Sequence, residues 1–546
     1  MSSKVETIKI ESNKLRGTLA ESLTNPITGS LFEDDQTVIK FHGIYQQDDR
    51  DRRDERAKKK LEPLYSFMIR LRIPGGKISA QQWVGINKIA DDNSTGVIKV
   101  TTRQTIQLHG VFKSVLKPTV KWFDKYNLDS IAACGDVNRN IMSTATVAKT
   151  KAEDEAYEYS KLISEKLLPA TNAYKEIWLD GEKVTHEEEE PIYGNTYLPR
   201  KFKIVVAIPP DNDVDLYAHD IGLIAIIKND KLLGFNITIG GGMGNTHGNA
   251  TTFPRLGDLI GFAPKEKILD VVTAILTTQR DYGNREDRKL SRFKYTVDRL
   301  GVDFIKGEIE KRSIKLEDAK DFIFSTRNDY YGWFDDYKGL HHNLIFVENG
   351  RILDDKKAQL KTALLKITEA DLADIRFTSN QNIIVSNIKP ENKPKVVAIL
   401  EKYKVSDADV SNIRKNAMAC VALNTCPLAL AEAQRYLPSL IDKFEALLQK
   451  HNIADNPVSV RMTGCPNGCA RPFMSEIGFV GRSLGKYNMY IGGSDIGERL
   501  NTLYKEDLNE HEILENLDIL FASYAKNKGK NESFGDFSYK LVKGVN

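Results

Sequence analysis

Cysteine is scarce in this chain, and the marks of secreted or membrane proteins are missing. Five cysteines among 546 residues are too few, and odd in number, for a disulfide framework. The N-terminus MSSKVETIKIES has no apolar core, so we expect no secretory signal. No apolar stretch approaches the roughly 18 residues that span a bilayer. These absences predict a cytoplasmic protein that makes no membrane contact.

An excess of charge of one sign is also lacking. Lys and Arg number 78 and Asp and Glu 75, which leaves a net charge of +3. This balance argues against nucleic acid as a partner, because a basic excess is the usual footprint of nucleic-acid binding. One dense charge run, RDRRDERAKKK at residues 50–60, is typical of a solvated helix face or arm.

The chain is long enough for about three or four domains, and strands alternate with helices along it. Apolar periodicity predicts helices near 152–167, 268–275, 437–447 and 513–524, and strands at 202–208, 223–227 and 235–239. This alternation favours an α+β fold, a mixed α/β chain of several domains.

An internal repeat organises the chain. Residues 67–111 and 342–388 both read as a strand, a glycine turn, an amphipathic helix and a strand with a T-x-x-Q core. Four positions differ in kind between the copies: Arg70, Arg72, Arg103 and His109 in the first stand against Leu344, Phe346, Asn380 and Ser386 at or near the same places in the second. We therefore predict a duplicated architecture whose first copy is functional and whose second copy is structural.

Four of the five cysteines form two clusters, Cys420-x₅-Cys426 and Cys465-x₃-Cys469. Thiolates are soft ligands for iron–sulfur clusters and zinc. The C-x₂₋₄-C spacing of structural zinc sites fits the second cluster and not the first. Wide spacing suits a cubane that takes thiolates from several directions. An iron–sulfur cluster is favoured, with zinc and unligated buried thiols as alternatives, and Cys134 is interpreted as a core thiol.

Basic side chains gather at strand ends and turns. They are Arg70, Arg72, Arg103, Arg139, Arg200, Lys201 and Lys203. The strand period of two puts the ammonium groups of Lys201 and Lys203 on one face. The spacing of Arg285, Arg288 and Arg292 predicts one helical face. Solvated surface is the alternative for any one of them, but guanidinium groups beside a redox metal predict a polyanionic ligand.

Two further features are less specific. The glycine run at 240–244 resembles a dinucleotide loop only loosely, because Asn245 stands at the sixth position and no acidic residue follows at the right distance. We expect these glycines to let the backbone approach a bulky cofactor closely. His109 could be a haem ligand, a polar contact or a satisfied core residue, and we interpret it as a polar contact.

Taken together, these motifs resemble the sulfite and nitrite reductase hemoprotein family, and most closely its NADPH-dependent assimilatory branch. The resemblance rests on TGCPNGC and the cysteine spacing, and on FHGIYQQDDRD, RLRIPGG, TTRQTIQLHG, DVNRN, TYLPRKFK and TTQRDYGNR, from about Ile10 to Tyr539. It implies two ferredoxin-like repeat halves and two larger α/β domains that bind sirohaem and the cluster. The implied division is an arm at 1–66, halves at 67–145 and 332–415, and larger domains at 146–331 and 416–546.

The resemblance implies two cofactors, a sirohaem and a 4Fe–4S cluster. Cys420, Cys426, Cys465 and Cys469 would ligate the cluster, and Cys469 would also bridge to the sirohaem iron. The substrate pocket would be formed by Arg70, Arg139, Lys201 and Lys203. Sirohaem would be held by Arg103, Gln107, His109, Arg200, Lys294 and Asn467. Lys99 stands where related sequences carry Arg, so it keeps the charge and loses the bidentate fork.

The implied reaction is the six-electron reduction of sulfite to hydrogen sulfide, a step of sulfur assimilation and cysteine biosynthesis. Lys201 and Lys203 would donate protons, because neighbouring cations lower the pKa of an ammonium group. Arg70 and Arg139 would orient the anion. Nitrite, a smaller anion, would fit the same pocket.

The implied partner is a flavoprotein. We find no convincing flavin or nicotinamide domain in the sequence, so electrons from NADPH would arrive through an FAD- and FMN-containing subunit of a hetero-oligomer. The nearest alternative is a ferredoxin-dependent sirohaem nitrite or sulfite reductase. Lys203 argues against it, because the nitrite branch tends to have Asn at that position. An alternative of another class is a non-catalytic protein with a structural zinc ion or cluster.

Overall fold

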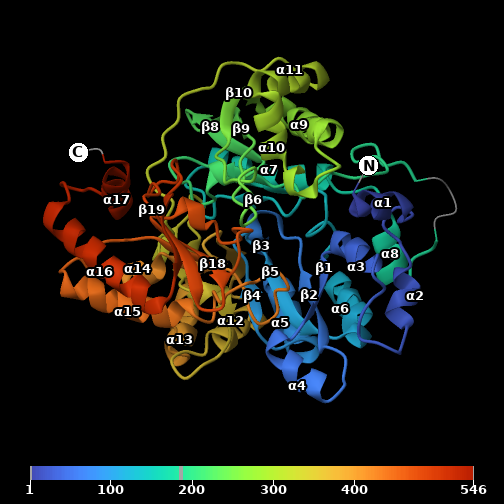
Figure 1. The fold of residues 1–546 in the computed structure, drawn as a ribbon, viewed down its shortest axis with the longest axis horizontal. Coiled ribbons are helices and arrows are strands. Elements are labelled where there is room, and N and C mark those ends of the chain that lie inside the picture. The colour runs from blue at the N-terminus through green and yellow to red at the C-terminus, as the bar shows by residue number, and fades with distance from the viewer. Residues whose placement is uncertain (1–2, 184–187, 545–546) are drawn as a thin grey trace.

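Four five-stranded sheets form the frame of the molecule (Figure 1). The computed structural model describes residues 3–183 and 188–544, so the predicted segments lie within the described residues except at 1–2, 184–187 and 545–546. Helices and strands alternate throughout, and the predicted α+β class is confirmed.

The first sheet is built mainly from the first repeat, with one edge strand from the N-terminal segment and the other from the second repeat. Its strands, in spatial order, are β1 (Ile44–Asp48), β2 (Tyr65–Arg70), β5 (Ile106–Val111), β4 (Ile98–Val100) and β13 (Arg351–Ile352). Every neighbouring pair is antiparallel. Helices α5 (Ala80–Asn93) and α6 (Lys113–Lys125) accompany it. Ser79 begins α5 with a capping box, because its hydroxyl accepts from the Gln82 N–H and the Gln82 side chain accepts in return.

The second repeat builds the second sheet in the same order. Its strands are β11 (Gly332–Asp335), β12 (His341–Ile345), β15 (Ile383–Ile388), β14 (Asp374–Phe377) and β3 (Lys77–Ile78), with α12 (Leu360–Glu369) and α13 (Lys393–Lys402). The predicted repeat is therefore confirmed element by element, from strand through helix to the final pair of strands.

The two halves exchange their edge strands. β3 belongs to the first repeat but pairs with β14 of the second, with Ile78 opposite Ile375. In return β13 of the second repeat pairs with β4 of the first, with Ile352 opposite Ile98. Each sheet is completed by the other half, so the two halves share one continuous core.

A second duplication covers the larger α/β parts. One sheet holds β6 (Met142–Ser143), β7 (Ile204–Ala207), β8 (Ile221–Lys228), β9 (Lys231–Ile239) and β10 (Asp258–Pro264); the other holds β16 (Ala417–Ala419), β17 (Val460–Thr463), β18 (Ile477–Ser483), β19 (Lys486–Ile491) and β20 (Thr502–Leu508). In both, the first three strands run parallel and the last two antiparallel. The repeat in the sequence thus extends to a two-fold plan for most of the chain.

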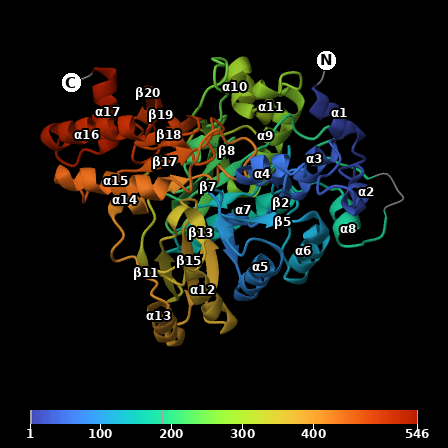
Figure 2. The same ribbon diagram turned by 60° about the horizontal axis from the view of Figure 1, so that its bottom comes forward.

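The helices predicted from apolar periodicity are present. They are α7 (Lys151–Lys166), α9 (Ile268–Tyr282), α15 (Leu437–Lys450) and α16 (Glu510–Asn527). The 152–167 helix buries Ala152, Ala156 and Ile163 on one stripe, as expected. Figures 1 and 2 show α9, α10 (Phe293–Leu300) and α11 (Val302–Arg312) grouped together, apart from α15, α16 and α17 (Phe534–Lys543) near the C-terminus.

The N-terminal segment packs against the first sheet. It contains α1 (Lys4–Glu11), α2 (Leu19–Thr24), α3 (Asp35–Val38) and α4 (Arg53–Lys58), and it supplies β1 to that sheet. Another short helix, α8 (Ala173–Trp178), lies against α6. The charge run at 50–60 forms a short turn and α4, exposed along nearly its whole length, as predicted.

One local prediction is wrong. Arg285, Arg288 and Arg292 do not share a helical face, because Arg288 lies in a three-residue turn and α10 begins only at Phe293. Helix α9 has already ended at Tyr282, and Asp287 caps the start of the separate short turn by accepting from the Lys289 N–H. The three guanidinium groups instead bind separate carboxylates, those of Glu6, Asp136 and Asp220 respectively.

None of the helices within 3–183 and 188–544 is both long enough and apolar enough to cross a membrane.

Candidate active site

The four clustered cysteines meet at one edge of the last sheet. Cys420 follows β16 and Cys465 lies two residues after β17, and these strands are parallel neighbours, so their carboxyl ends lie together. The Gly464 N–H donates to the Cys420 sulfur at 3.4 Å. The Leu430 N–H, just after Cys426, donates to the Gly464 carbonyl at 2.8 Å. Two cysteine loops 38 residues apart in sequence therefore form one structure.

The thiols influence one another electrostatically. Burial raises the pKa of Cys420, Cys426 and Cys465, that of Cys465 to about 12, and the nearby Cys469 raises each of them further. Cys469 itself is exposed. One buried and two half-buried thiols that resist ionisation, beside a fourth that is exposed, are a set that a cationic metal centre would convert to thiolates.

The donor set fits a cluster better than a single ion. No three His, Cys, Asp or Glu side chains of residues 3–183 and 188–544 are placed to hold one ion together. The thiols lie within electrostatic reach without meeting at a point, which is the arrangement that a cubane needs, since its irons stand apart. The chemistry of this set therefore fits a 4Fe–4S cluster.

Two lysines next to this site have no partner for their charge. Lys201 and Lys203 flank Phe202, which is buried and packs against Phe293, so both ammonium groups lie on the other side of the chain. Across the described residues, neither Nζ atom has a carboxylate or carbonyl partner. Burial, together with Arg200 and Arg292, lowers the pKa of Lys201 to about 7.

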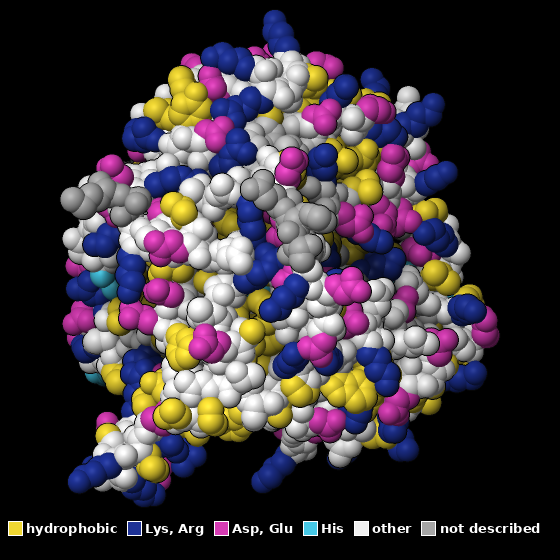
Figure 3. Space-filling view, turned by 90° about the vertical axis from the view of Figure 1, so that its right-hand side faces the viewer, with side chains coloured by type: hydrophobic (Ala, Val, Ile, Leu, Met, Phe, Trp, Pro, Cys, Tyr) yellow, Lys and Arg dark blue, Asp and Glu magenta, His cyan; other side chains and the backbone are white. Residues whose placement is uncertain are grey.

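The pKa of Lys203 is lowered further by the same causes. Burial comes first, followed by Lys201 and Arg103, and the result lies well below the usual value of a lysine. Cys469 raises the pKa of both ammonium groups, so the two lysines lie within electrostatic reach of the exposed thiol. Half-buried ammonium groups without a counter-charge are costly, and they favour a place where an anion binds. Lys and Arg side chains gather inside a hollow near the middle of one face of the molecule (Figure 3).

The two predicted arginines of the pocket are held by neighbours on the first sheet. Arg70 donates to the Cys134 sulfur at 3.0 Å and to the Gln107 amide oxygen, at 3.1 Å from Nε. Arg139 donates from Nε to the Gly135 carbonyl at 2.7 Å. Its guanidinium group also interacts electrostatically with Tyr45, which favours the charged form of Arg139. Cys134 is buried, as predicted for a core thiol, and additionally supports Arg70.

The residues predicted to hold a cofactor divide into two groups. The charges of Arg103 and Arg200 lack close partners. Arg103 Nε is buried without a hydrogen-bond partner, and Arg200 Nη1 lies 4.0 Å from the nearest oxygen of Asp136. Burial lowers the pKa of Arg103 to about 9 and that of Arg200 to about 10. Both would gain from an anionic cofactor, so these residues fit a ligand that carries carboxylates.

Gln107, His109 and Asn467 lie at the cysteine loops: His109 is near Thr425 of the first loop, and Asn467 belongs to the second. His109 Nδ1 lies 3.1 Å from the Gln47 amide oxygen and 3.4 Å from the Thr425 hydroxyl, and its Nε2 lies 3.4 Å from the Gln107 amide. Burial lowers the pKa of His109 to about 3, so the imidazole is neutral and makes polar contacts. Asn467 donates to the Cys465 sulfur at 3.5 Å.

Lys294 has a different environment. Its ammonium group donates to the carbonyls of Gly242 at 3.1 Å, Gly244 at 2.6 Å and Phe253. Burial lowers its pKa to about 6, although three carbonyl acceptors favour the charged form. In this structure Lys294 ties down the glycine run, and its contact with a cofactor stays a prediction.

The glycine run approaches protein backbone. A side chain on Gly241 would meet the Tyr217 carbonyl at 2.1 Å, and one on Gly244 would meet the Asn467 carbonyl at 3.1 Å. The Asn245 N–H donates to the Pro466 carbonyl at 2.9 Å. These glycines therefore bring the loop after β9 against the loop that carries Cys465 and Cys469, whereas the sequence suggested an approach to a cofactor.

Sequence reasoning missed several residues of the site. Asp220 accepts from the Lys203 N–H at 3.0 Å and from Arg292 at 2.9 Å, so it fixes the segment that presents the two lysines. His219 donates from Nε2 to the Val214 carbonyl at 3.0 Å and can accept from Arg103 at Nδ1. Tyr45 stands in the motif FHGIYQQDDRD, which could have signalled it, whereas no motif marks Asp220 or His219.

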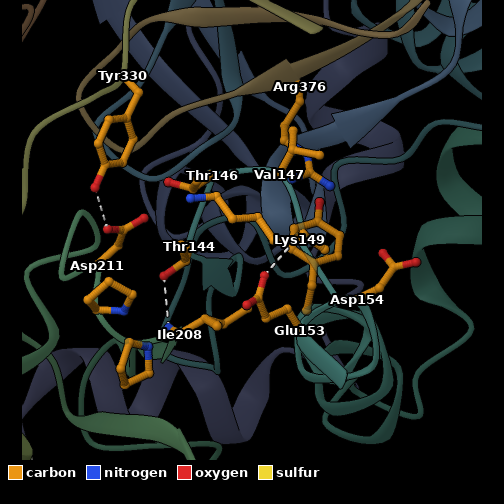
Figure 4. Close-up of a pocket in the computed structure, with 14 residues that line it drawn as sticks. Thr144, Thr146, Val147, Lys149, Glu153, Asp154, Ile208, Asp211, Tyr330 and Arg376 are labelled. Carbon is orange, nitrogen blue, oxygen red and sulfur yellow. Dashed lines mark hydrogen bonds between the residues drawn. The ribbon is translucent and has the colours of Figure 1, made fainter. Parts of the chain in front are cut away.

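A second hollow lies away from the cysteines. It is lined by residues of α7 and β14 and by Pro209 and Pro210, and Figure 4 shows Tyr330 directed at Asp211, to which its hydroxyl donates at 2.9 Å. None of the predicted site residues lines it. The chemistry described above therefore belongs to the cysteine edge.

Two family models match the chain. The model described as Nitrite/Sulfite reductase ferredoxin-like half domain matches residues 59–121 and again 336–403. The model described as Nitrite and sulphite reductase 4Fe-4S domain matches residues 158–316. That segment contains no cysteine, and the four clustered cysteines lie in the later copy of the same sheet plan.

Curated relatives match over nearly the full length. A protein of Leptospira biflexa serovar Patoc is 59% identical over 98% of this chain and 98% of its own length, and one of Staphylococcus epidermidis is 53% identical over 98% and 94%. Both are named "Sulfite reductase [NADPH] hemoprotein beta-component". The solved structure of Mycobacterium tuberculosis NirA protein superposes with a TM-score of 0.80 at 22% identity, covering 98% of this chain and 95% of that one, and shows the same fold.

Proposed function

The chain belongs to the sulfite and nitrite reductase hemoprotein family, in its NADPH sulfite reductase branch, and we propose that its cysteine edge is where sulfite is reduced to hydrogen sulfide. The protein is an oxidoreductase that acts on sulfur compounds, with sirohaem and a 4Fe–4S cluster as cofactors. The observation that carries the site is the pair of unpartnered ammonium groups, Lys201 and Lys203, beside the exposed Cys469.

The cofactors have separate sets of ligands. Cys420, Cys426, Cys465 and Cys469 would hold the cluster, and the exposed thiol of Cys469 would be the one available to couple the cluster to the sirohaem. Arg103 and Arg200, whose charges lack close partners, bind carboxylates of the sirohaem. When bound, the coupled pair supplies electrons one at a time to an anion in the pocket. Lys99, with its ammonium buried on the Asn349 carbonyl, is assigned no sirohaem contact.

The protein supplies charge and protons to the substrate. Arg70 is anchored by Cys134 and Gln107 and Arg139 by Gly135, so each presents a fixed guanidinium group to one sulfite oxygen. Lys201 and Lys203 complete a cationic pocket that attracts the anion far more strongly than in water. Their lowered pKa values suit them to donate the protons that leave with each oxygen as water.

The electron donor is a separate FAD- and FMN-containing flavoprotein that takes electrons from NADPH, in a cytoplasmic hetero-oligomer. The name shared by the Leptospira and Staphylococcus relatives supports this proposal. Lys203 and the identity to NADPH-type relatives both favour sulfite over the ferredoxin-dependent nitrite reaction. Nitrite remains a second anion that the same pocket accommodates.

An absorption spectrum tests the function. The protein would be purified without oxygen from cells that make sirohaem, beside a Cys469→Ser variant with intact folding by circular dichroism. We expect haem and cluster bands in the parent and loss of the coupled spectrum in the variant. A colourless parent protein, or cluster absorption without haem bands, would end the enzyme proposal.

A further inference from the structure

Two apolar side chains are exposed directly after a cluster ligand. Leu428 is 62% exposed and Leu430 is 42% exposed, two and four residues beyond Cys426. Between them, Ala429 is buried. Single exposed leucines are ordinary, but two that follow a predicted cluster ligand within four residues form an apolar spot beside that ligand.

The charge run at 50–60 is fastened to this same loop. The Arg50 N–H donates to the Asn424 carbonyl at 3.2 Å. Its guanidinium group donates to the Cys426 carbonyl at 3.1 Å and the Ala429 carbonyl at 2.6 Å. Just beyond, Arg435 binds Asp51 at 2.7 Å. The run is therefore held beside the cysteine loop, at a sequence separation of 376 residues.

This segment has a higher net positive charge than the chain as a whole. Seven basic and three acidic residues between 50 and 60 give +4, in a chain whose net charge is +3. Lys58 and Lys60 are exposed, and in the described part of the chain neither ammonium group has a hydrogen-bond or ion-pair partner. Free surface charges of one sign steer an oppositely charged partner during encounter.

We infer that Leu428, Leu430 and the 50–60 run form the docking surface for the electron-donating domain of the flavoprotein, a domain with an acidic rim. The inference rests on the proposed function. A small apolar centre within a charged rim is the composition of a weak, transient electron-transfer contact, which buries less than about 1,200 Å². Basic side chains at the rim raise the rate at which this domain docks, without making its contact with the surface permanent.

The surface also explains why the run is anchored. A charged arm that served only solubility would not need Arg50 on the Cys426 and Ala429 carbonyls. A donor bound to Lys58 and Lys60 at one end and to Leu428 at the other lies over Cys426, so its redox group comes close to the cluster. Electron transfer slows steeply with distance. Docking at this position would keep the distance between the donor's redox group and the cluster short.

The test compares two electron donors on the holoenzyme. The variants are Lys58→Glu with Lys60→Glu, and Leu428→Gln alone. Sulfite reduction is measured with reduced methyl viologen, which needs no docking surface, and with NADPH plus the purified flavoprotein. We expect the flavoprotein-driven rate to fall about tenfold at low salt in the double variant, because steering raises association rates by about that factor or more. The viologen rate should stay unchanged.

The matched control variants change exposed residues on α16 and just after its C-terminal end. Lys526→Glu with Lys530→Glu changes the same charge, and Ile519→Gln, at 67% exposure, makes the same apolar-to-amide change. Both controls should leave both rates intact. Added salt should slow the flavoprotein reaction of the parent and controls and have little effect on the Lys58/Lys60 variant, since screening removes the same attraction.

Three results would overturn the inference. One is an unchanged flavoprotein rate in the surface variants, and another is an equal loss with viologen, which would mean structural damage. A third is faster turnover with reduced ferredoxin than with the flavoprotein, lost in the same variants. Flavoprotein binding to the immobilised holoenzyme is measured separately from turnover. Weaker binding by the Lys58/Lys60 variant than by the parent supports docking at this surface, whatever the turnover. A parent protein that reduces no sulfite would refute only the proposed function.

Discussion

At the scale of single residues, the pocket is marked by charge that the protein leaves without partners. Arg72, Arg288 and Arg292, which the sequence could not separate from the rest, are neutralised by Asp129, Asp136 and Asp220. Lys201 and Lys203 are not. Burial without a counter-charge is energetically unfavourable, so it persists where an anionic ligand compensates for it.

The first prediction separates proton donation from anion binding. Lys203→Ala should lower kcat by about 10²–10⁴, the range for loss of a positioned proton donor, with a smaller change in KM for sulfite. Arg139→Ala should mainly raise KM, because arginine cannot donate a proton usefully and contributes charge. Steady-state kinetics with reduced methyl viologen distinguishes them, and the reverse pattern in both variants would refute the assignment.

The second prediction concerns pH. The pKa of Lys201 is about 7, so its ammonium form, the proton donor, is lost as pH rises through that value. We expect kcat to fall between about pH 6.5 and 8.5, and Lys201→Arg to lower kcat and remove this limb. Cofactor content, read from the haem band, must be equal in both proteins. An unchanged descending limb in Lys201→Arg would assign it to another group.

The free energy of unfolding also depends on pH through Lys201. The unfolded chain holds the Lys201 proton up to about 10.5, whereas the folded chain releases it near 7. The unfolded state therefore binds more protons between these values, and the free energy of unfolding contributed by this group rises with pH across that window.

At the scale of elements, the exchange of β3 and β13 ties the two ferredoxin-like halves together. Apolar patterning alone revealed the repeat, because strand and helix periods are local properties. The exchange was not visible in the sequence, since two-residue strands carry too little pattern to reveal which sheet they join. The boundaries 1–66, 67–145, 146–331, 332–415 and 416–546 remain predictions, and β1 and the exchanged strands cross them.

The third prediction tests the exchange. Ile352 on β13 is fully buried against the first sheet, so Ile352→Ala should lower the free energy of unfolding by about 2–4 kcal/mol. The matched control Ile323→Ala, at 77% exposure, should change little. Urea denaturation followed by circular dichroism measures both. An equal effect of the two substitutions would mean that β13 does not hold the halves together.

At the scale of the whole molecule, one buried carboxylate joins the two larger α/β parts. Asp215, ahead of β8, accepts from Arg461 on β17 and from Arg471. Arg327 lies 3.7 Å away. Burial opposes its ionisation, yet these three cations hold the pKa of Asp215 below its usual range. The cysteine edge and the lysine segment are thereby brought together from distant parts of the chain.

The fourth prediction follows from this junction. Asp215→Asn should lower the free energy of unfolding by about 3–5 kcal/mol at pH 7, because it leaves three buried cations without a counter-charge. The carboxylate contributes stability above its unfolded pKa of about 3.8 and loses it as pH falls towards the lower folded value. The difference between variant and parent in urea midpoint should therefore shrink in acid. The exposed Asp180→Asn serves as the control, and a variant as stable as the parent would contradict the proposed junction.

By itself, the sequence determined the α+β class and the first repeat, because strand alternation and helix periodicity are local signals. The cofactor ligands and the cationic pocket, which the family resemblance implies, remain predictions. Only the tertiary structure decided which cations stay unpaired, that Tyr45, Asp220 and His219 lie among the predicted site residues, that the larger sheets are also duplicated, and that the 50–60 run lies beside Cys426. These facts depend on contacts between residues far apart in the chain, and such contacts leave no periodic or motif signal in a single sequence.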